Sequence, residues 1–558
     1  MTITFMKVIR LPFLLLSFFC AFGACQEPPR PVPVEIVREP ELLNPKTGEV
    51  IAGAIAYALE NKGRVDDSII LAETALVAAI YDKAPATRIW SDERQWLAVS
   101  DSLVGFIRGS ERFALFPQDY HLRHIESLRD RLRDSAAQTD AALWARGELM
   151  LSDAFAGICR DLKLGRLGRD SVTLRQDTLL PAEQVANLLI KMQQGAGLTA
   201  LFEGLEPHHP GYLALKEALP AFLDSMDRTP YTYIQWPKKD SITFVQQLQS
   251  RLFEDAHITF NTREADSLEL AGAIRKAQEA RGLTVDGKAG PQLVRSLNNT
   301  GREKFIRIVI NMDRYKQLPE EMPPRYVWVN LAAFRMQLID SGQIMMESRV
   351  IVGQPKTRSP VLTSSIYNLV TMPQWTVPYS IIFNEMLPKI QKSTEYLRKE
   401  NLMVVDRYDS IIPPDSIDWS KLNKKYFPYL LKQRQGDDNS LGVIKFNFQN
   451  KYDVYLHDTN ARSLFSRHNR AMSHGCIRVQ KWDSLAKVLA SSDSVRHHPD
   501  SIAQWIKRGE KRFVTLRNKT PIYIRYFTTE ADEGNIRFYE DIYSDDKLLI
   551  GKYFASKF

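Results

Sequence analysis

The most informative part of this 558-residue chain is a pair of short stretches, which read YLHDT at residues 455–459 and SHGCIRV at residues 473–479. The first predicts a β-strand that ends near His457, and the second predicts a returning segment in which Gly475 allows a close backbone approach. A thiol is a poor nucleophile until it loses its proton, so a working cysteine needs a histidine or another cation beside it. The two stretches therefore predict a Cys476 nucleophile that is activated by His457.

The neighbouring residues weigh against other interpretations of this thiol. Gly475 exposes backbone N–H groups of the kind that a developing oxyanion requires, and His474 is two residues from Cys476. The histidine precedes the cysteine, which is the opposite of the order in papain-like proteases. A zinc site made of His457, His474 and Cys476 has no standard spacing, so no metal is predicted. An inert buried cysteine is disfavoured, because polar residues flank Cys476 on both sides.

Together, these stretches strongly resemble the catalytic segment of the L,D-transpeptidase family, in which a histidine, a spacer and Ser/Thr-His-Gly-Cys follow one another. Four upstream stretches match the family as well: RVIVG at 349–353, SPVL at 359–362, PQWTVP at 373–378 and LGVIKF at 441–446. The resemblance is specific over residues 323–526. It implies a catalytic domain with a mixed, β-sandwich-like fold.

The resemblance also assigns roles to individual residues. It implies that Cys476 is acylated, that His457 is the base, and that the main-chain carbonyl of Asp458 orients the imidazole. His474 and Gly475 are expected to shape the acyl pocket. Supporting or substrate-binding roles fall to Asp458, Ser473, Arg478 and Trp375; Ser473 is expected to brace the turn and Arg478 to hold the substrate or the loop.

The activity implied is a two-step acyl transfer without a cofactor. The thiolate takes the acyl group of a peptidoglycan tetrapeptide stem and releases D-alanine, and the third-residue amine of another stem completes a 3→3 crosslink used in cell-wall biogenesis. Three alternatives remain open: an L,D-carboxypeptidase, a protein-to-wall attachment enzyme and a non-catalytic wall-binding protein. A Cys476 with a lowered pKa would favour the enzymes, and an ordinary thiol would favour the binding protein.

The N-terminus predicts export. Lys7 and Arg10 precede an apolar run at residues 11–23, so residues 1–24 are expected to be a signal peptide. The stretch AFGAC at 21–25 resembles a lipoprotein cleavage box, which would make Cys25 a lipidated residue; ordinary cleavage near Ala24 is the alternative. The expected location is the periplasm or cell envelope, with or without a lipid anchor.

The rest of the chain divides by its patterns into a multi-domain α+β protein. We expect a Pro-rich linker at 25–46, a helical scaffold domain at 47–238 and a catalytic domain at 301–530 with an inserted lid at about 387–435, followed by a C-terminal extension at 531–558. Residues 239–300 predict three helices and resemble a peptidoglycan-binding domain. Cys159 lies on an apolar helical pattern and is expected in the core.

The charge balance agrees with a wall polymer as partner. Lys and Arg number 74 and Asp and Glu 66, which gives a net charge of +8. This excess is spread along the chain, so it suits an anionic polymer but does not indicate nucleic acid. The expected partners are the stem peptides and the glycan of peptidoglycan, and the oligomeric state stays open.

Overall fold

The computed structural model describes residues 34–83, 88–236, 238–256, 267–491 and 498–557. The expected signal peptide at 1–24 and Cys25 lie outside these residues. The chain forms two compact units, of which one is Met1–Leu97 with His124–Asp153 and the other Ala98–Arg123 with Ala154–Phe558. In the described ranges, no helix combines the length and the apolar character that a membrane span needs.

The first unit is helical. Its elements include α1 (Pro40–Glu60), α2 (Thr74–Lys83), most of α4 (Leu122–Arg131) and the first half of α5 (Ala141–Leu164). Glu148 of α5 is fully buried and accepts hydrogen bonds from the backbone N–H groups of Ile89 and Trp90, at 2.8 and 3.0 Å. The helix α1 starts inside the predicted 25–46 linker, because Pro40 fits the first turn of a helix, where its missing N–H costs nothing.

The second unit contains the remaining helices. In the described ranges, those that precede the sheet include α3 (Ala98–Arg108), α6 (Ala182–Gln193), α7 (Leu198–Glu203), α8 (Pro210–Ser225), α9 (Ser241–Glu254), α10 (Ser267–Ala280), α11 (Pro291–Asn298) and α12 (Gly301–Tyr315). The helices α9 to α11 are the three predicted for residues 239–300, and Phe244, Leu248, Ile274 and Leu293 form their small core. Cys159 is fully buried, as expected.

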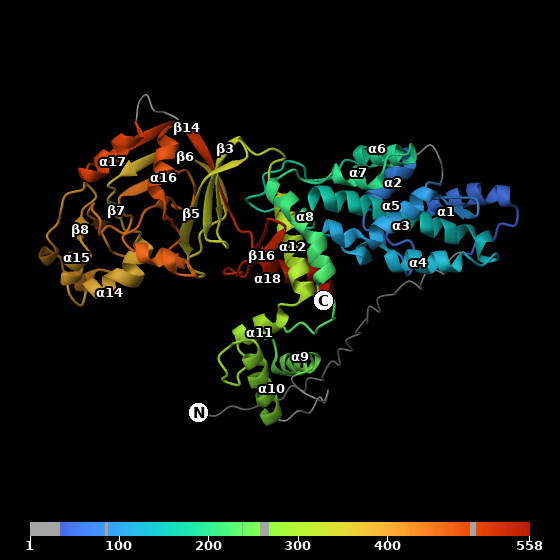
Figure 1. Ribbon diagram of the computed structural model, residues 1–558, viewed down its shortest axis with the longest axis horizontal. Coiled ribbons are helices and arrows are strands. Elements are labelled where there is room, and N and C mark those ends of the chain that lie inside the picture. Colours follow the sequence, from blue (N-terminus) through green and yellow to red (C-terminus); the bar gives the residue numbers. More distant parts are fainter. Residues whose placement is uncertain (1–33, 84–87, 237, 257–266, 492–497, 558) are drawn as a thin grey trace, which may run out of the picture. The chain divides into compact units, whose positions relative to one another are not determined.

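The C-terminal half is built on a mixed sheet, which confirms the predicted multi-domain α+β fold (Figure 1). Its strands are β3 (Arg325–Asn330), β4 (Arg335–Asp340), β5 (Gln343–Gly353), β6 (Leu362–Thr371), β10 (Ile444–Phe448), β11 (Leu456–His457), β12 (Ala471–Ser473), β13 (Ile477–Val479) and β14 (Arg512–Arg525). Their order is β12-β5-β13-β11-β10-β6-β14-β3-β4, and β4 also pairs with β5, so the sheet closes on itself.

The sequence explains the start of this sheet. The strands β3 and β4 pair with each other, and β4 forms a hairpin with β5 because Ser341 and Gly342 turn the chain with φ of +50° and +79°. Alternate residues such as Val327, Val329 and Leu338 are fully buried in one apolar core. The helices α16 (Trp482–Ser491) and α17 (Pro499–Lys507) pack against β14 and β6 respectively.

The inserted segment is larger than predicted and has a core of its own. It contains β7 (Trp375–Thr376), β8 (Leu402–Val405), β9 (Leu430–Gln433), α14 (Leu387–Ile390) and α15 (Glu395–Lys399). Its strands form a separate sheet in the order β7-β9-β8, and Ile382, Leu387 and Leu431 are among the side chains buried within it. The insertion begins before residue 387 because Trp375 already pairs with Gln433.

The segment predicted as a C-terminal extension is integrated into the second unit. It comprises β15 (Thr529–Asp532), β16 (Asn535–Phe538) and α18 (Asp545–Leu549), and it packs against α8 and α12 (Gly301–Tyr315). Asp546 is buried and pairs with Arg307 at 3.4 Å and with Arg314 at 2.7 Å, both on α12. A buried carboxylate with two cationic partners fixes this segment in place.

Candidate active site

Two adjacent parallel strands bring the predicted site residues onto one face of the sheet. In the pairing of β11 with β13, His457 lies opposite Arg478, and the N–H of Ile477 donates to the carbonyl of Tyr455 at 3.1 Å. Directly paired residues project to the same side, and so do residues two positions apart on one strand. Tyr455, His457, Cys476 and Arg478 therefore share a face.

The antiparallel neighbour β10 adds a cation to this face. Lys445 lies directly opposite His457, and its Nζ is 3.8 Å from the centre of the Tyr455 ring. The Tyr455 side chain also interacts with both the Cys476 thiol and the Trp375 side chain. Lys445 and Tyr455 were not among the predicted site residues. Their signal in the sequence is the two-residue alternation that places Tyr455 on the same face as His457.

The contacts of His457 determine which ring nitrogen can act as a base. Its Nδ1 contacts the main-chain carbonyl of Asp458, the arrangement that the family resemblance implies. A carbonyl only accepts hydrogen bonds, so Nδ1 carries the proton and Nε2 of the neutral ring is left as the acceptor. Burial, with Arg478 and then Lys445 adding to it, lowers the pKa of His457 to about 3. The imidazole is therefore neutral at physiological pH.

The pKa of the Cys476 thiol moves in the opposite direction from the one that an activated cysteine would suggest. Burial raises it, and the hydrogen bond from Tyr455 and the charges of Lys445 and Arg478 only partly oppose that effect. The resting pair is thus a neutral thiol with a neutral imidazole. A lowered resting pKa cannot serve to distinguish an enzyme from a binding protein here, contrary to the expectation from the sequence.

The turn that carries Cys476 is braced by Ser473, the role expected for this serine. Ser473 Oγ donates to the Cys476 carbonyl at 2.6 Å and accepts from the Gly475 N–H at 3.2 Å. Gly475 has a φ of +120°, a backbone conformation that residues other than glycine rarely adopt. Its N–H group is engaged by Ser473, so it is not the free oxyanion donor that the sequence suggested.

Comparison with known proteins agrees with this geometry. Residues 324–523 match the family described as the L,D-transpeptidase catalytic domain. This part of the chain is therefore similar to the L,D-transpeptidase catalytic family. Residues 75–219 match a scaffold domain, which coincides with the helical region before the transpeptidase domain.

A relative in Haemophilus influenzae, provisionally named an L,D-transpeptidase, is 34% identical over 252 residues. The match spans 45% of this chain and half the length of the relative. Among solved structures, an Enterococcus faecium L,D-transpeptidase mutant is 11% identical over 37% of this chain and 50% of its own, with a TM-score of 0.17. An L,D-transpeptidase from Mycobacterium smegmatis is 14% identical over 36% and 58%, with a TM-score of 0.16. Structural likeness this low supports no further inference.

Two other predicted residues of the transpeptidase domain turn away from the thiol. The Asp458 carboxylate is buried and accepts hydrogen bonds from the Val443 N–H at 3.1 Å and from Arg462 at 2.7 Å. His474 Nε2 lies 2.7 Å from Oε1 of Glu385, which belongs to the insertion. His474 therefore links the catalytic turn to the insertion.

Arg478 is a predicted site residue whose side chain has an unsatisfied hydrogen-bond donor among the described residues. Its Nε is buried and, among the residues that the structure describes, has no hydrogen-bond partner. Burial lowers the pKa of both Arg478 and Lys445, so two partly desolvated cations border the transpeptidase thiol. Such groups gain most from an anionic ligand.

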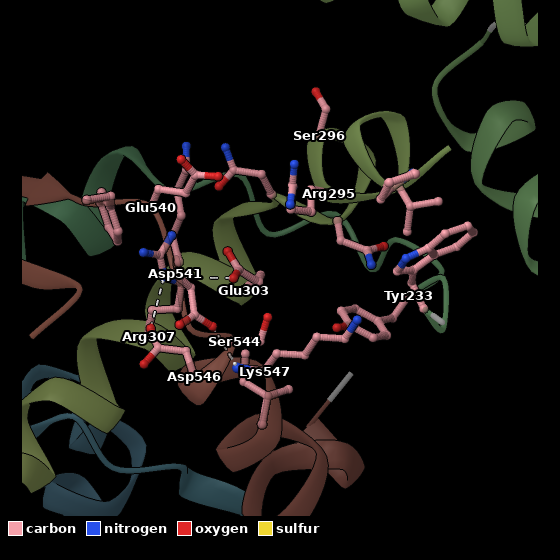
Figure 2. A pocket seen from close by; sticks show the side chains of 18 of the residues that line it. Tyr233, Arg295, Ser296, Glu303, Arg307, Glu540, Asp541, Ser544, Asp546 and Lys547 are labelled. Atoms are coloured by element: carbon pink, nitrogen blue, oxygen red, sulfur yellow. Dashed lines mark hydrogen bonds and ion pairs between the residues drawn. The ribbon is translucent and has the colours of Figure 1, made fainter. Parts of the chain in front are cut away.

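The second unit also contains a hollow that does not include the Cys476 site. A cavity of about 930 Å³ lies between α11, α12 and the C-terminal segment, and its lining includes Tyr233, Arg295, Glu303, Asp541 and Lys547 but neither His457 nor Cys476 (Figure 2). Burial raises the pKa of Glu303 to about 7.

Over the described ranges, no three His, Cys, Asp or Glu side chains are grouped so that they could hold a metal ion.

Proposed function

We propose that this protein is a peptidoglycan L,D-transpeptidase, which transfers the acyl group of a tetrapeptide stem through Cys476 to the third-residue amine of a second stem. The observation that carries the proposal is the shared face of Tyr455, His457 and Cys476, with His457 Nδ1 held by the Asp458 carbonyl. The similarity of residues 324–523 to the L,D-transpeptidase catalytic family supports the reaction class.

In the first half-reaction, Cys476 attacks the carbonyl carbon between the third and fourth residues of the donor stem. The thiol proton passes to His457 Nε2, the ring nitrogen that the Asp458 contact leaves free. The carbon–nitrogen bond then breaks, and the same proton leaves with the amine of D-alanine. The product is a thioester, which conserves the energy of the peptide bond without ATP.

In the second half-reaction, the amine of the acceptor stem attacks the thioester carbonyl. His457 takes a proton from this amine and returns it to the departing sulfur, so the thiol and the neutral imidazole are restored. A base with a pKa as low as that of His457 is neutral at the start of both steps, and it gains its proton only as the developing imidazolium is balanced by a developing negative charge.

The cations beside the thiol suit the anionic character of the donor. Peptidoglycan stems carry carboxylates, and Arg478 offers a buried Nε without a partner among the described residues. We propose that Arg478 binds a donor carboxylate or the developing oxyanion, and that Lys445 adds to the local positive potential while packing on Tyr455. Both roles are electrostatic, because neither cation is placed to accept a proton.

Transfer to an amine is favoured over hydrolysis by the surroundings of the thiol. The side chain of Cys476 is partly buried against the core, and Trp375 of the insertion interacts with Tyr455 beside it. A second contact, between Glu385 and His474, holds the insertion at the catalytic turn. The His474–Glu385 contact is itself exposed, so we propose that it holds the insertion in place and that Trp375 limits the access of water to the thioester, which favours a transpeptidase over an L,D-carboxypeptidase.

The decisive experiment is intact-mass analysis of the purified protein after exposure to a tetrapeptide donor. We expect a covalent adduct, release of D-alanine and, with acceptor present, 3→3 crosslinked dimers. Cys476→Ala should abolish all three while the far-UV circular dichroism and melting temperature stay unchanged. A folded wild-type protein that gives no adduct with the donor or with a carbapenem refutes the proposal; tripeptide products without dimers would instead establish the carboxypeptidase.

We further propose that the protein is exported and works in the periplasm or cell envelope, with or without a lipid on Cys25. Support comes from the sequence alone, in the apolar run at residues 11–23 and the cleavage-box resemblance at 21–25. Cell fractionation of wild type and Cys25→Ala tests it. Release of the variant from membranes identifies lipidation, and equal release of both identifies ordinary cleavage.

A further inference from the structure

The C-terminal segment lies outside the residues that match the catalytic family, yet it returns to the loop beside the catalytic turn. Tyr543 stands between β16 and α18 and is buried, with 7% of its surface exposed. Its phenol donates a hydrogen bond to the carbonyl of Gly353 at 2.7 Å and accepts one from the N–H of Ser359 at 3.2 Å. One hydroxyl thus ties together both ends of the loop at residues 353–359.

This loop in turn holds the residue next to the nucleophile. Ser359 Oγ accepts from the Gly353 N–H at 2.9 Å and donates to the carbonyl of Gly475 at 2.7 Å. Thr357 Oγ1 and the Gln354 N–H both donate to the carbonyl of Ser473, at 3.0 and 2.9 Å. The loop therefore holds the catalytic turn by hydrogen bonds to two carbonyl groups, those of Ser473 and Gly475, one on each side of His474.

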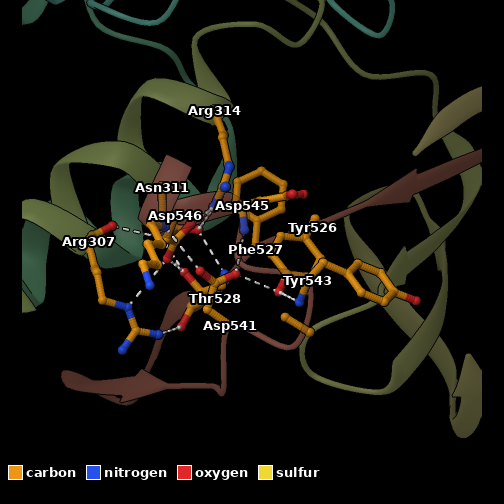
Figure 3. Close-up of polar contacts among 12 residues, drawn as sticks. Arg307, Asn311, Arg314, Tyr526, Phe527, Thr528, Asp541, Tyr543, Asp545 and Asp546 are labelled. Carbon is orange, nitrogen blue, oxygen red and sulfur yellow. Dashed lines mark hydrogen bonds and ion pairs between the residues drawn. The ribbon is translucent and has the colours of Figure 1, made fainter. Parts of the chain in front are cut away.

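Tyr543 is itself held from two directions. Its N–H donates to the Tyr526 hydroxyl at 3.0 Å, which donates to Asp541 at 2.8 Å, and the two tyrosine rings stack with centres 5.4 Å apart. Arg358 lies over the Tyr543 ring at 4.5 Å, and its Nη2 is 2.6 and 2.7 Å from the two carboxylate oxygens of Asp545. Figure 3 shows Tyr526, Asp541, Tyr543 and Asp545 gathered in one polar cluster.

We propose that Tyr543 is a positioning residue for Cys476, acting through Gly353, Ser359 and Gly475; this inference rests on the proposed function. Gly475 has a φ of +120° and no side chain that restricts its backbone. The orientation of the peptide plane that joins Gly475 to Cys476 therefore depends on the contacts that this peptide makes. The bond from Ser359 to the Gly475 carbonyl fixes that plane. The orientation of the plane decides where the N–H and Sγ of Cys476 point.

Without the phenolic hydroxyl, the Gly353 carbonyl and the Ser359 N–H lose a partner at a buried place. The loop must then move to find other partners or water, because unpaired buried polar groups are costly. Its movement shifts the hydroxyl that holds Gly475. A displacement of about 1 Å at a reacting group is enough to cost about 100-fold in rate.

The test uses the full-length protein with the substitution Tyr543→Phe, which keeps both ring contacts and deletes only the hydroxyl. We expect the rate of Cys476 acylation by a carbapenem, measured by intact mass, to fall by about 10- to 100-fold. With a tetrapeptide donor, kcat should fall while KM stays the same, because the donor-binding cations are untouched. The pH profile of Cys476 alkylation by iodoacetamide should shift as well.

The matched control is Tyr539→Phe. Tyr539 belongs to the same segment, and its hydroxyl donates to Glu530 at 2.9 Å rather than to the 353–359 loop. It should react at the wild-type rate. Ser359→Ala should imitate Tyr543→Phe, Ser359→Thr should restore part of the rate, and the double variant should lose less than the product of the single effects, because both residues act in one chain.

The proposal is overturned if Tyr543→Phe is acylated at the wild-type rate with an unchanged alkylation profile. It is also overturned if Tyr539→Phe is slowed equally, in step with a lower melting temperature, since that result makes the hydroxyl merely structural. Failure of the proposed function looks different: wild type itself would not be acylated. The alkylation profiles would then still decide whether Tyr543 positions the thiol.

Discussion

The substitution Gly442→Ala tests how His457 is held. Gly442 precedes β10 with a φ of +58°, and a Cβ at this position would overlap the carboxylate of Asp458. Asp458 is 1% exposed and supplies the carbonyl that contacts His457 Nδ1. The added methyl group must therefore push Asp458 out of place, and His457 with it.

The size of the effect has two parts. Alanine in the left-handed region costs about 1–2 kcal/mol wherever it occurs. Displacing the Asp458 carboxylate also weakens its hydrogen bonds with the Val443 N–H and Arg462, a loss of about 1.5–3 kcal/mol that is smaller for the half-exposed Arg462. Misplacement of the base by a fraction of an ångström to 1 Å then predicts a fall in acylation rate of about 30-fold.

The assay is the carbapenem acylation rate by intact mass, together with the melting temperature. Gly509→Ala is the matched control: its φ is +69°, and its Cβ would meet open space. It carries the same backbone strain without the clash, so it should acylate at the wild-type rate. A folded Gly442→Ala protein that acylates as fast as Gly509→Ala would refute the link from Gly442 through Asp458 to His457.

Two further predictions concern the insertion and the response to acid. Glu385→Gln should raise the ratio of hydrolysed to crosslinked product, measured by mass spectrometry, because it weakens the contact with His474. The control is Glu395→Gln, which changes an insertion carboxylate that pairs with Arg398, and equal ratios for the two variants would contradict the shielding role. The pKa of His457 is about 3 in the folded protein and about 6.5 in the unfolded chain. Between these two pH values only the unfolded chain takes up a proton at this histidine. The free energy of unfolding should therefore fall as the pH drops below 6.5, by about 2 kcal/mol at pH 5. His457→Gln should lose this part of the acid sensitivity in denaturation at pH 7 and pH 5, and an unchanged pH dependence would argue against a neutral buried imidazole.

Local patterns account for the first two strands of the main sheet. Residues 326–331 and 334–340 are rich in β-forming side chains that partly alternate apolar with polar, and Ser341-Gly342 supplies a turn; the structure has β3 and β4 there. The closure of the sheet was not predicted, because it depends on pairings between strands far apart in the sequence, such as β3 with β14 and β5 with β13, and on the twist of the whole sheet. The insertion was placed too late because the two-residue strand β7 is too short to carry a periodic signal.

In the candidate site, the sequence motif predicted which residues form the site better than it predicted the environment of those residues in the folded protein. His457 and Cys476 could be predicted from spacing and residue type, whereas the roles of Ser473 and Asp458 were implied by the family resemblance; the structure shows the contacts of both. The raised pKa of Cys476 could not, because burial is a property of the folded core. Tyr543 could not either, since it lies 67 positions beyond Cys476 and approaches it only through the loop at 353–359.

The insertion has a narrow neck, and this has a consequence for engineering. Trp375 pairs directly with Gln433, so the two points where the chain leaves and re-enters the transpeptidase domain are neighbours on adjacent strands. Because the insertion has its own core and sheet, a two- or three-residue turn could replace everything between these strands without opening the main sheet. The insertion could therefore be removed or exchanged as one unit while His457 and Cys476 keep their places on the main sheet.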